Sequence, residues 1–211
     1  MSNDQVYAAG LLTEALDPAH QPEAIRAFLA DEEALVHQLL GAFGDGLPDV
    51  VDLGCGTGRH LGGLAGKVGL GLGIDYEPMY IREARRLVSN PQLHFVVADA
   101  TRVPVDGTFD FALCLTSSWG TMSDKSGVLE EMKRLAPEPG SRLVTVYAPS
   151  SVPFRTEWYG RLGHPVAQVA DDHILTEDGF RSEHYGPDRI RELVGPCVLH
   201  PIGEVAFLVQ A

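Results

Sequence analysis

Residues 50–60 read VVDLGCGTGRH, an apolar run that passes directly into a loop rich in glycine. Gly54, Gly56 and Gly58 alternate with small residues there, so a ligand can approach the backbone closely. A strand, a glycine-rich turn and a helix in this order place free N–H groups and the positive end of a helix dipole beside that ligand. The stretch therefore predicts a nucleotide or nucleotide-like cofactor at the end of a buried strand.

Short apolar runs alternate with helical segments on both sides of this loop, which is typical of a parallel α/β sheet with right-handed crossovers. The expected strands are 49–53, 70–75, 93–98, 109–115, 141–148 and two more within 198–210, joined by a tight turn near 201–203. The expected helices are two within 1–46, then 58–66, 77–89, 124–136 and 187–194.

These patterns divide a single domain of 211 residues into four regions. Residues 1–46 are helical and 47–148 form the core that carries the glycine loop. Residues 149–186 depart from the rhythm, being rich in Pro, Gly, His and aromatic residues, and are expected to form an insertion of short strands or loops. Residues 187–211 are expected to supply a last helix and the final strands.

Composition and charge narrow the class of protein. Asp and Glu total 29 against 16 Lys and Arg, and the basic residues are scattered, which disfavours nucleic acid as the main partner. No apolar run long enough to span a membrane and no signal peptide is visible, so we expect a soluble cytoplasmic protein without a membrane partner. The three cysteines are far apart and show no pattern of metal ligands.

The spacing of the glycines separates two classes of cofactor. A dinucleotide fingerprint, G-x-G-x-x-G, would need its third glycine at position 59, where this chain has Arg59. The loop instead resembles, in its sequence DLGCGTG, the first motif of class I S-adenosylmethionine-dependent methyltransferases. The resemblance implies that the methionine part of the cofactor is surrounded by Gly54, Cys55, Gly56 and Gly58.

Two further strand ends carry carboxylates in the order that this family shows. Asp75 follows the second strand about 20 residues beyond the loop, where a carboxylate can accept hydrogen bonds from both hydroxyls of a ribose. The resemblance implies that Tyr76 adds apolar surface near the adenine. It also implies that Asp99 accepts from the adenine amino group, while the backbone of Ala100 reaches a ring nitrogen.

The resemblance covers about residues 46–148 and continues through TFDFALCLTSSWG and MKRLAPEPGSRLVTVYA. It implies a Rossmann-like class I methyltransferase fold, with a mostly parallel seven-stranded sheet, an antiparallel C-terminal strand and helices on both faces. It also implies S-adenosylmethionine as cofactor and S-adenosylhomocysteine as product. The alternative is that the glycines form a structural turn and that Asp75 and Asp99 only cap the ends of strands.

Candidates for the rest of the site flank this core. Thr116 and Trp119 follow the fourth strand, where Thr116 is expected to contact the cofactor and Trp119 to form a wall of the acceptor site. The sequence TSSW is not the Asn/Asp-Pro-Pro-Tyr signature of base and glutamine methylation, which argues against those acceptors. Tyr7 resembles the tyrosine of an N-terminal lid over the cofactor, although it could equally anchor a helix to the core.

The insertion offers further side chains for the acceptor. Trp158, Tyr159 and Tyr185 are candidates for substrate contact, and His173 and His184 are candidates for the general base. The alternative is that each histidine is a surface or packing residue, since only their density in an irregular segment singles them out. Asp171, Asp172 and His173 lack ordered ligand spacing, so no metal is expected.

Three functions remain open at this stage. The first is transfer of a methyl group to oxygen or nitrogen of a small molecule, because the chain is short and acidic and shows no separate domain for a macromolecule. The second is methylation of a protein or peptide, and the third is a non-methylating protein that binds S-adenosylmethionine on the same fold. The identity of the acceptor and the oligomeric state are left open.

Overall fold

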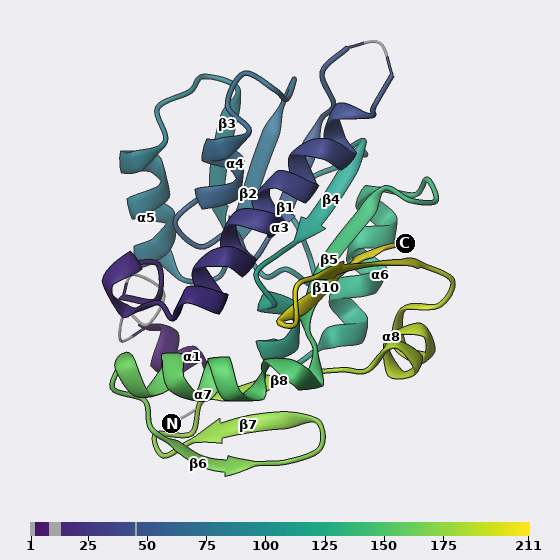
Figure 1. Cartoon of the computed structure of the whole chain (residues 1–211). Coiled ribbons are helices and arrows are strands. Elements are labelled where there is room, and N and C mark those ends of the chain that lie inside the picture. The colour runs from purple at the N-terminus through teal and green to yellow at the C-terminus, as the bar shows by residue number, and fades with distance from the viewer. Residues whose placement is uncertain (1–2, 9–13, 45) are drawn as a thin grey trace.

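The computed structural model describes residues 3–8, 14–44 and 46–211 (Figure 1). Its main sheet has seven strands in the order β3-β2-β1-β4-β5-β10-β9. Among the described strands of this sheet, β10 alone runs against its neighbours, β5 and β9. The strands are β1 Val50–Leu53, β2 Gly71–Asp75, β3 Leu93–Val97, β4 Phe111–Cys114, β5 Arg142–Tyr147, β9 Val198–Ile202 and β10 Ala206–Gln210. The Rossmann-like fold expected from the sequence is therefore confirmed.

Helices cover both faces of this sheet, and alternate residues of β1 pack into two separate clusters. Val50 joins the cluster of α3, α4 and α5, whereas Val51 joins that of α6 and α8. This alternation follows from the pleat, which sends successive side chains to opposite faces. The helices are α3 Glu23–Gly41, α4 Arg59–Gly63, α5 Pro78–Leu87, α6 Lys125–Leu135 and α8 Pro187–Val194.

The insertion contains more regular structure than its composition predicts. After the short 3-10 helix η3 (Pro149–Ser151), helix α7 spans Val152–Arg161, with its proline in the first turn, where a missing N–H costs nothing. A separate antiparallel sheet follows, made of β6 Val166–Val169, β7 His173–Thr176 and β8 Arg181–Glu183. The expectation of short strands was correct, but the helix was missed because its aromatic residues mask a helical period.

Other predicted boundaries agree with the structure to within a few residues. Helix α8 spans the predicted 187–194, and the predicted strands each differ by one or two residues at an end. The turn of the last hairpin lies at 203–205, slightly later than predicted. The first predicted N-terminal helix includes residues 9–13, which lie outside the described part, whereas α1 (Asn3–Ala8) and η1 (Pro18–His20) are described.

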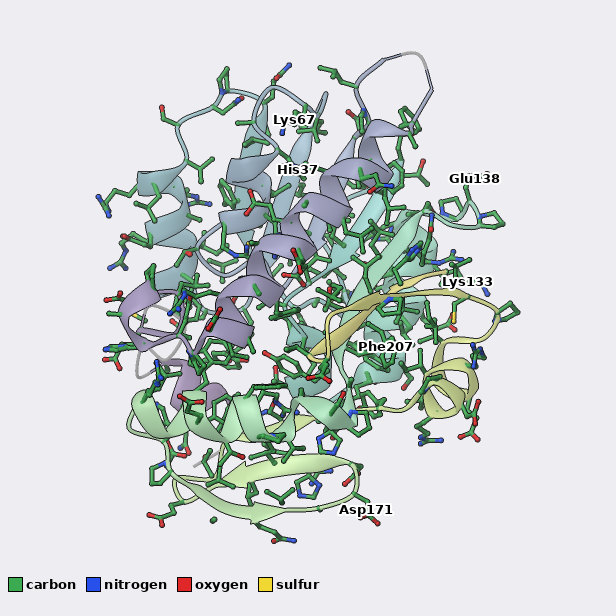
Figure 2. All side chains as sticks on the ribbon, viewed as in Figure 1. His37, Lys67, Lys133, Glu138, Asp171 and Phe207 are labelled. Atoms are coloured by element: carbon green, nitrogen blue, oxygen red, sulfur yellow. The ribbon has the colours of Figure 1, made fainter. Side chains whose placement is uncertain are left out.

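Segments that are distant in the sequence meet at one end of the molecule. Figure 1 shows α1, α7 and the small sheet together there, and Figure 2 places Asp171 on the outer side of that end, far from His37 of α3. The side chain of Asn3 donates to the carbonyl oxygens of Thr121 (2.7 Å) and Arg181 (2.8 Å) and accepts from the Arg181 amide (2.7 Å). These three bonds fasten α1 to β8 of the small sheet and to Thr121.

None of the helices in the described ranges combines the length and the apolar character that a membrane span requires.

Candidate active site

A cavity of about 500 Å³ opens where the first five strands end. Each of these strands contributes residues that directly follow or end it: 54–56 after β1, 75–76 at β2, 99–101 after β3, 115–118 after β4 and Tyr147 at β5. In open α/β sheets, ligands bind at this carboxyl edge. The volume falls in the range of small-molecule sites, so the topology and the cavity together indicate the place of binding.

The glycine loop keeps its backbone in conformations that other residues avoid. Gly54, Gly56 and Gly58 have φ angles of 76°, 52° and 79°. A Cβ on Gly54 would lie 2.8 Å from Cε of Met122, and one on Gly58 would lie 2.7 Å from the buried ring of Phe95. Gly54 lines the cavity, whereas Gly58 does not and instead allows the loop to pack against β3.

Asp75 ties the end of β2 to the glycine loop. Its Oδ2 accepts from the Gly56 amide at 2.8 Å, and its Oδ1 accepts from the Glu77 amide at 2.9 Å. Burial raises the pKa of Asp75, although these backbone donors favour the carboxylate and oppose the rise. Each oxygen keeps a second lone pair, so both can still accept hydroxyl hydrogens from a ligand in the cavity.

Asp99 and its neighbours form a more open rim. Asp99 is exposed and its Oδ1 accepts from the amide and the hydroxyl of Thr101, each at 2.8 Å. Ala100 lines the cavity beside it, and Tyr76, which is 44% exposed, lines the same side. The edge of the cavity nearest β2 and β3 therefore offers carboxylate acceptors together with aromatic surface.

Asp52, which sequence reasoning did not single out as a site residue, lies buried in the cavity wall. It is 1% exposed, and its Oδ2 has no hydrogen-bond partner in the described structure. Burial raises the pKa of Asp52 to about 6, with nearby His60 opposing the rise and nearby Glu32 adding to it. Buried polar atoms are normally hydrogen-bonded, so this oxygen marks the wall at Asp52 as a candidate contact for a ligand. Its place in the glycine motif was the signal that could have found it.

Glu32 of α3 holds the loop after β4 in place from behind the cavity. It is fully buried, and its Oε1 accepts from the Thr116 amide at 2.6 Å while its Oε2 accepts from the Thr116 hydroxyl at 2.9 Å. Arg59 donates to Oε2 at 3.0 Å, and His60 lies 3.4 Å from the same oxygen. Burial by itself would raise the pKa of Glu32, but His60 and Arg59 lower it to about 2.

The two hydrogen bonds from Thr116 to Glu32, here called the Glu32 clamp, account for an unusual backbone conformation in the loop after β4. Thr116 and Ser117 have φ angles of 52° and 59°, which are uncommon for residues with side chains and mark functional loops. The Ser117 hydroxyl accepts from the Tyr147 amide at 3.1 Å, so the turn is fastened on both sides. Sequence reasoning missed Glu32 because a buried acid in an amphipathic helix resembles its exposed neighbours.

Aromatic side chains enclose the opposite end of the cavity, beside β5 and α7. Tyr7 donates from its hydroxyl to Thr121 at 3.1 Å, and its ring meets Phe180 edge-on at 5.7 Å. The ring of Phe180 also meets that of Tyr159 edge-on, at 5.6 Å. Besides Tyr76, the aromatic residues that line the cavity are Tyr7, Tyr80, Tyr147, Trp158, Tyr159 and Phe180. This end suits a ligand with a flat apolar body.

Most of the predicted site residues therefore line one cavity. The residues predicted to bind the cofactor that line the cavity are Tyr7, Gly54, Cys55, Gly56, Asp75, Tyr76, Asp99, Ala100 and Thr116. The residues predicted to bind the substrate that line it are Trp158 and Tyr159.

Trp119 does not form a wall of this cavity, so that prediction needs correction. The left-handed turn at Ser117 leads into a 3-10 helix, Ser118–Thr121, and this turns Trp119 into the core on the α6 side. It is fully buried and its indole N–H donates to the Lys125 carbonyl at 3.0 Å. Tyr185 packs against it, with ring centroids 5.6 Å apart, and likewise does not line the cavity.

The two histidines predicted as bases also lie elsewhere. His173, on β7, pairs with Asp172 at 2.6 Å and lines no part of the cavity. His184 is 3% exposed and its Nδ1 lies 3.3 Å from a guanidinium nitrogen of Arg155. Desolvation, followed by the charge of Arg155, lowers the pKa of His184. Neither side chain reaches the cavity, because the small sheet directs them toward its outer side and toward α7.

Comparison with known proteins agrees with this geometry. Residues 50–140 match the family described as "Methyltransferase domain". The chain is 32% identical over 144 residues to the O-methyltransferase cnsE of Penicillium expansum, a match that covers 63% of this chain and 51% of that protein. The chain spans about half the length, or less, of the curated relatives it matches.

Solved structures share the whole fold at low sequence identity. A protein of Pyrococcus horikoshii OT3 aligns with a TM-score of 0.69 at 18% identity, over 91% of this chain and 94% of that one. The magnesium protoporphyrin IX methyltransferase of Synechocystis PCC 6803, solved with bound SAH, aligns with a TM-score of 0.63 at 18% identity, over 89% and 84% of the two chains. At this identity the likeness establishes the fold.

Proposed function

We propose that the chain, whose residues 50–140 match a methyltransferase domain and whose sheet has the strand order expected for that fold, uses S-adenosylmethionine to methylate an oxygen or nitrogen of a small molecule. The observation that carries this proposal is the convergence of five strand ends on one cavity, with carboxylates at one side and aromatic rings at the other. The reaction is an in-line displacement in which the methyl group leaves the sulfonium sulfur for the acceptor atom.

The residues present fit this cofactor. Asp75 retains a lone pair on each oxygen for the two ribose hydroxyls, and Gly54 lines the cavity with backbone alone. The orphaned Oδ2 of Asp52 offers an acceptor for the positively charged methionine end. Asp99 offers an acceptor for the adenine amino group at the open rim.

The contribution of the protein is then mainly positioning and exclusion of water. The clamp of Glu32 on Thr116 holds the loop after β4 against the cavity, and Tyr7 with Phe180 covers the aromatic end. A cavity of about 500 Å³ leaves room for a small acceptor rather than for a folded protein domain. We therefore propose that the acceptor binds at the aromatic end, beside Trp158 and Tyr159.

Calorimetry with S-adenosylmethionine and S-adenosylhomocysteine tests the cofactor assignment. Asp75→Asn keeps the shape of the side chain and removes its charge, so both ligands should bind at least about tenfold more weakly, which is about 1.4 kcal/mol. Asp106→Asn, on an exposed loop outside the cavity, is the matched control and should leave binding unchanged. Equal affinities for the Asp75 variant and the native chain would contradict the assignment.

Transfer of a labelled methyl group tests the class of acceptor. Incubation with a cell extract should carry the label into the low-mass fraction. Label recovered in protein would favour a protein acceptor, and binding of the cofactor without transfer to any fraction would favour a non-methylating role.

A further inference from the structure

Arg155 is a buried cation for which the described structure holds no counterion. It lies on α7, has an exposed fraction of 0%, and forms no ion pair with any carboxylate in the described ranges. Burial of an unpaired charge costs several kcal/mol, and such groups are normally paired. The cost therefore calls for a negative charge that the described residues do not supply.

Neutral groups surround the guanidinium. It donates to the Ser182 carbonyl at 2.7 Å, to the Ser151 hydroxyl at 3.3 Å and to the Tyr159 hydroxyl at 3.3 Å. Its central carbon lies 4.2 Å from the centroid of the Tyr147 ring. Tyr147, Tyr159 and Ser182 all line the cavity, so Arg155 lies directly behind the wall of its aromatic end.

The same wall carries hydrogen-bond donors that lack acceptors. Trp158 is 4% exposed, and its indole N–H has no partner in the described structure. The Tyr159 hydroxyl accepts from Arg155 but donates to none of the described residues, and the Tyr147 hydroxyl forms no hydrogen bond with them. Burial raises the pKa of Tyr147 well above its usual value, so the phenol keeps its proton and remains a donor.

We propose, as an extension of the proposed function, that the acceptor carries an acidic oxygen on an aromatic or apolar body and binds as its anion against Tyr147, Tyr159 and Trp158, with Arg155 as the positioning charge. The two phenol hydroxyls and a cation without a counterion then share one ligand group, while Trp158, whose indole N–H is itself enclosed, supplies apolar surface. The shared chemistry is that of a phenolate or a carboxylate. An ammonium group, which aromatic rings also attract, would meet the repulsion of Arg155.

The other charged groups near this wall do not cancel the positive charge that Arg155 places behind it. His184 is held neutral at ordinary pH, since burial and the charge of Arg155 lower its pKa. Glu183 faces away and pairs with Lys125 at 3.1 Å and with Arg181 at 3.1 Å. Glu32 acts on Tyr147 from the α3 side, but its charge is compensated by Arg59 and His60.

Three probes of one shape test the proposal on the full chain saturated with S-adenosylhomocysteine: 2-naphthoate, 2-naphthol and 2-naphthylmethylammonium. Binding is followed by fluorescence and calorimetry from pH 6 to 10. The carboxylate should bind at least about tenfold more tightly than the ammonium compound. Binding of the naphthol should strengthen as the pH rises toward the pKa of the naphthol itself, because more of the probe is then an anion. The tighter of the two anions identifies whether the natural group is a carboxylate or a phenolate.

Variants separate an electrostatic role of Arg155 from a structural one. Arg155→Met should abolish the preference for the anion and remove the pH dependence of naphthol binding, whereas Arg155→Lys should restore part of both. Tyr159→Phe, which removes one hydroxyl and keeps the ring, should lower the affinity for the anion by about threefold to tenfold. Arg161→Met, an exposed arginine on the same helix, is the matched control and should change neither.

The outcomes distinguish the two proposals. If S-adenosylhomocysteine fails to bind, the proposed function fails. If it binds but the ammonium probe binds as tightly as the anions, or none of the three probes binds, the inference about Arg155 is overturned while the proposed function stands. Should Arg155→Met not fold, Arg155→Lys and Tyr159→Phe decide the question: a reduced preference for the anion in both supports the proposal, and an unchanged preference counts against it.

Discussion

Single residues in the cavity wall carry charge at a cost to the fold, and Asp52 is the clearest example. Its carboxyl group is 1% exposed and has an unpartnered oxygen, and burial raises its pKa from 3.8 to about 6. A carboxyl whose pKa is higher in the folded chain binds more protons there than in the unfolded chain. Its stabilising contribution is therefore full below about pH 4 and is lost as pH rises through 6.

Asp52→Asn should remove this dependence. The free energy of unfolding of the variant, relative to the native chain, should grow by about 2 kcal/mol between pH 4 and pH 7, because the variant no longer ionises at this position. Urea unfolding of the cofactor-free proteins at several pH values measures the difference, and comparison of the pair cancels the titration of all other groups. The same variant should bind S-adenosylmethionine more weakly. A difference that stays constant with pH would contradict the burial of a charged Asp52.

At the scale of elements, Glu32 connects α3 to the start of α4 and to the loop after β4. Its pKa is lowered to about 2, so the stabilisation is present above pH 4.5 and is lost as pH falls toward 2. Glu32→Gln should lower the free energy of unfolding at pH 7 by about 3 kcal/mol, since Arg59 and His60 lose their counterion. Denaturant titration at pH 7 measures this loss of stability. Thermal scans from pH 3 to 7 should show that the difference between the variant and the native chain becomes smaller as the pH falls.

The neighbouring Glu33 provides the control for this prediction. It lies on the same helix and approaches Arg59 at 3.6 Å, but its side chain is 40% exposed. Glu33→Gln should therefore change the free energy of unfolding by less than about 0.5 kcal/mol. Equal effects of the two substitutions would mean that the buried clamp does not hold these elements together.

For the whole molecule, the sheet was predictable because its strands are short segments rich in apolar residues and bounded by turn residues. The cofactor side of the cavity was predictable for the same reason, since Asp75 and Asp99 stand at strand ends and the topology brings those ends together. Glu32 and Asp52 escaped prediction as site residues because their roles depend on burial by segments distant in the sequence. Proximity in sequence says little about the direction of a side chain, which is why His173 and His184 were misplaced.

The cover of the cavity is likewise a property of the whole chain, because α1, the loop at Thr121 and β8 come from three separate regions. Asn3 fastens them with three hydrogen bonds, while Tyr7 on the same helix lines the cavity. A helix of six residues held in this way can open locally without global unfolding. Ligand contact with Tyr7 should therefore slow hydrogen exchange in α1.

Asn3→Ala should weaken binding of S-adenosylhomocysteine by about threefold to tenfold, mainly through faster dissociation, because two carbonyl groups and one amide lose their partner. The melting temperature of the cofactor-free chain should hardly change, since we expect α1 to open before the core of the sheet unfolds. Asn90→Ala, which removes a side-chain hydrogen bond at a surface turn outside the cavity, is the control. Stopped-flow binding and hydrogen exchange of 3–8 measure both effects. Identical dissociation rates for the two variants, or exchange in α1 that is insensitive to the ligand, would show that this helix does not close the site.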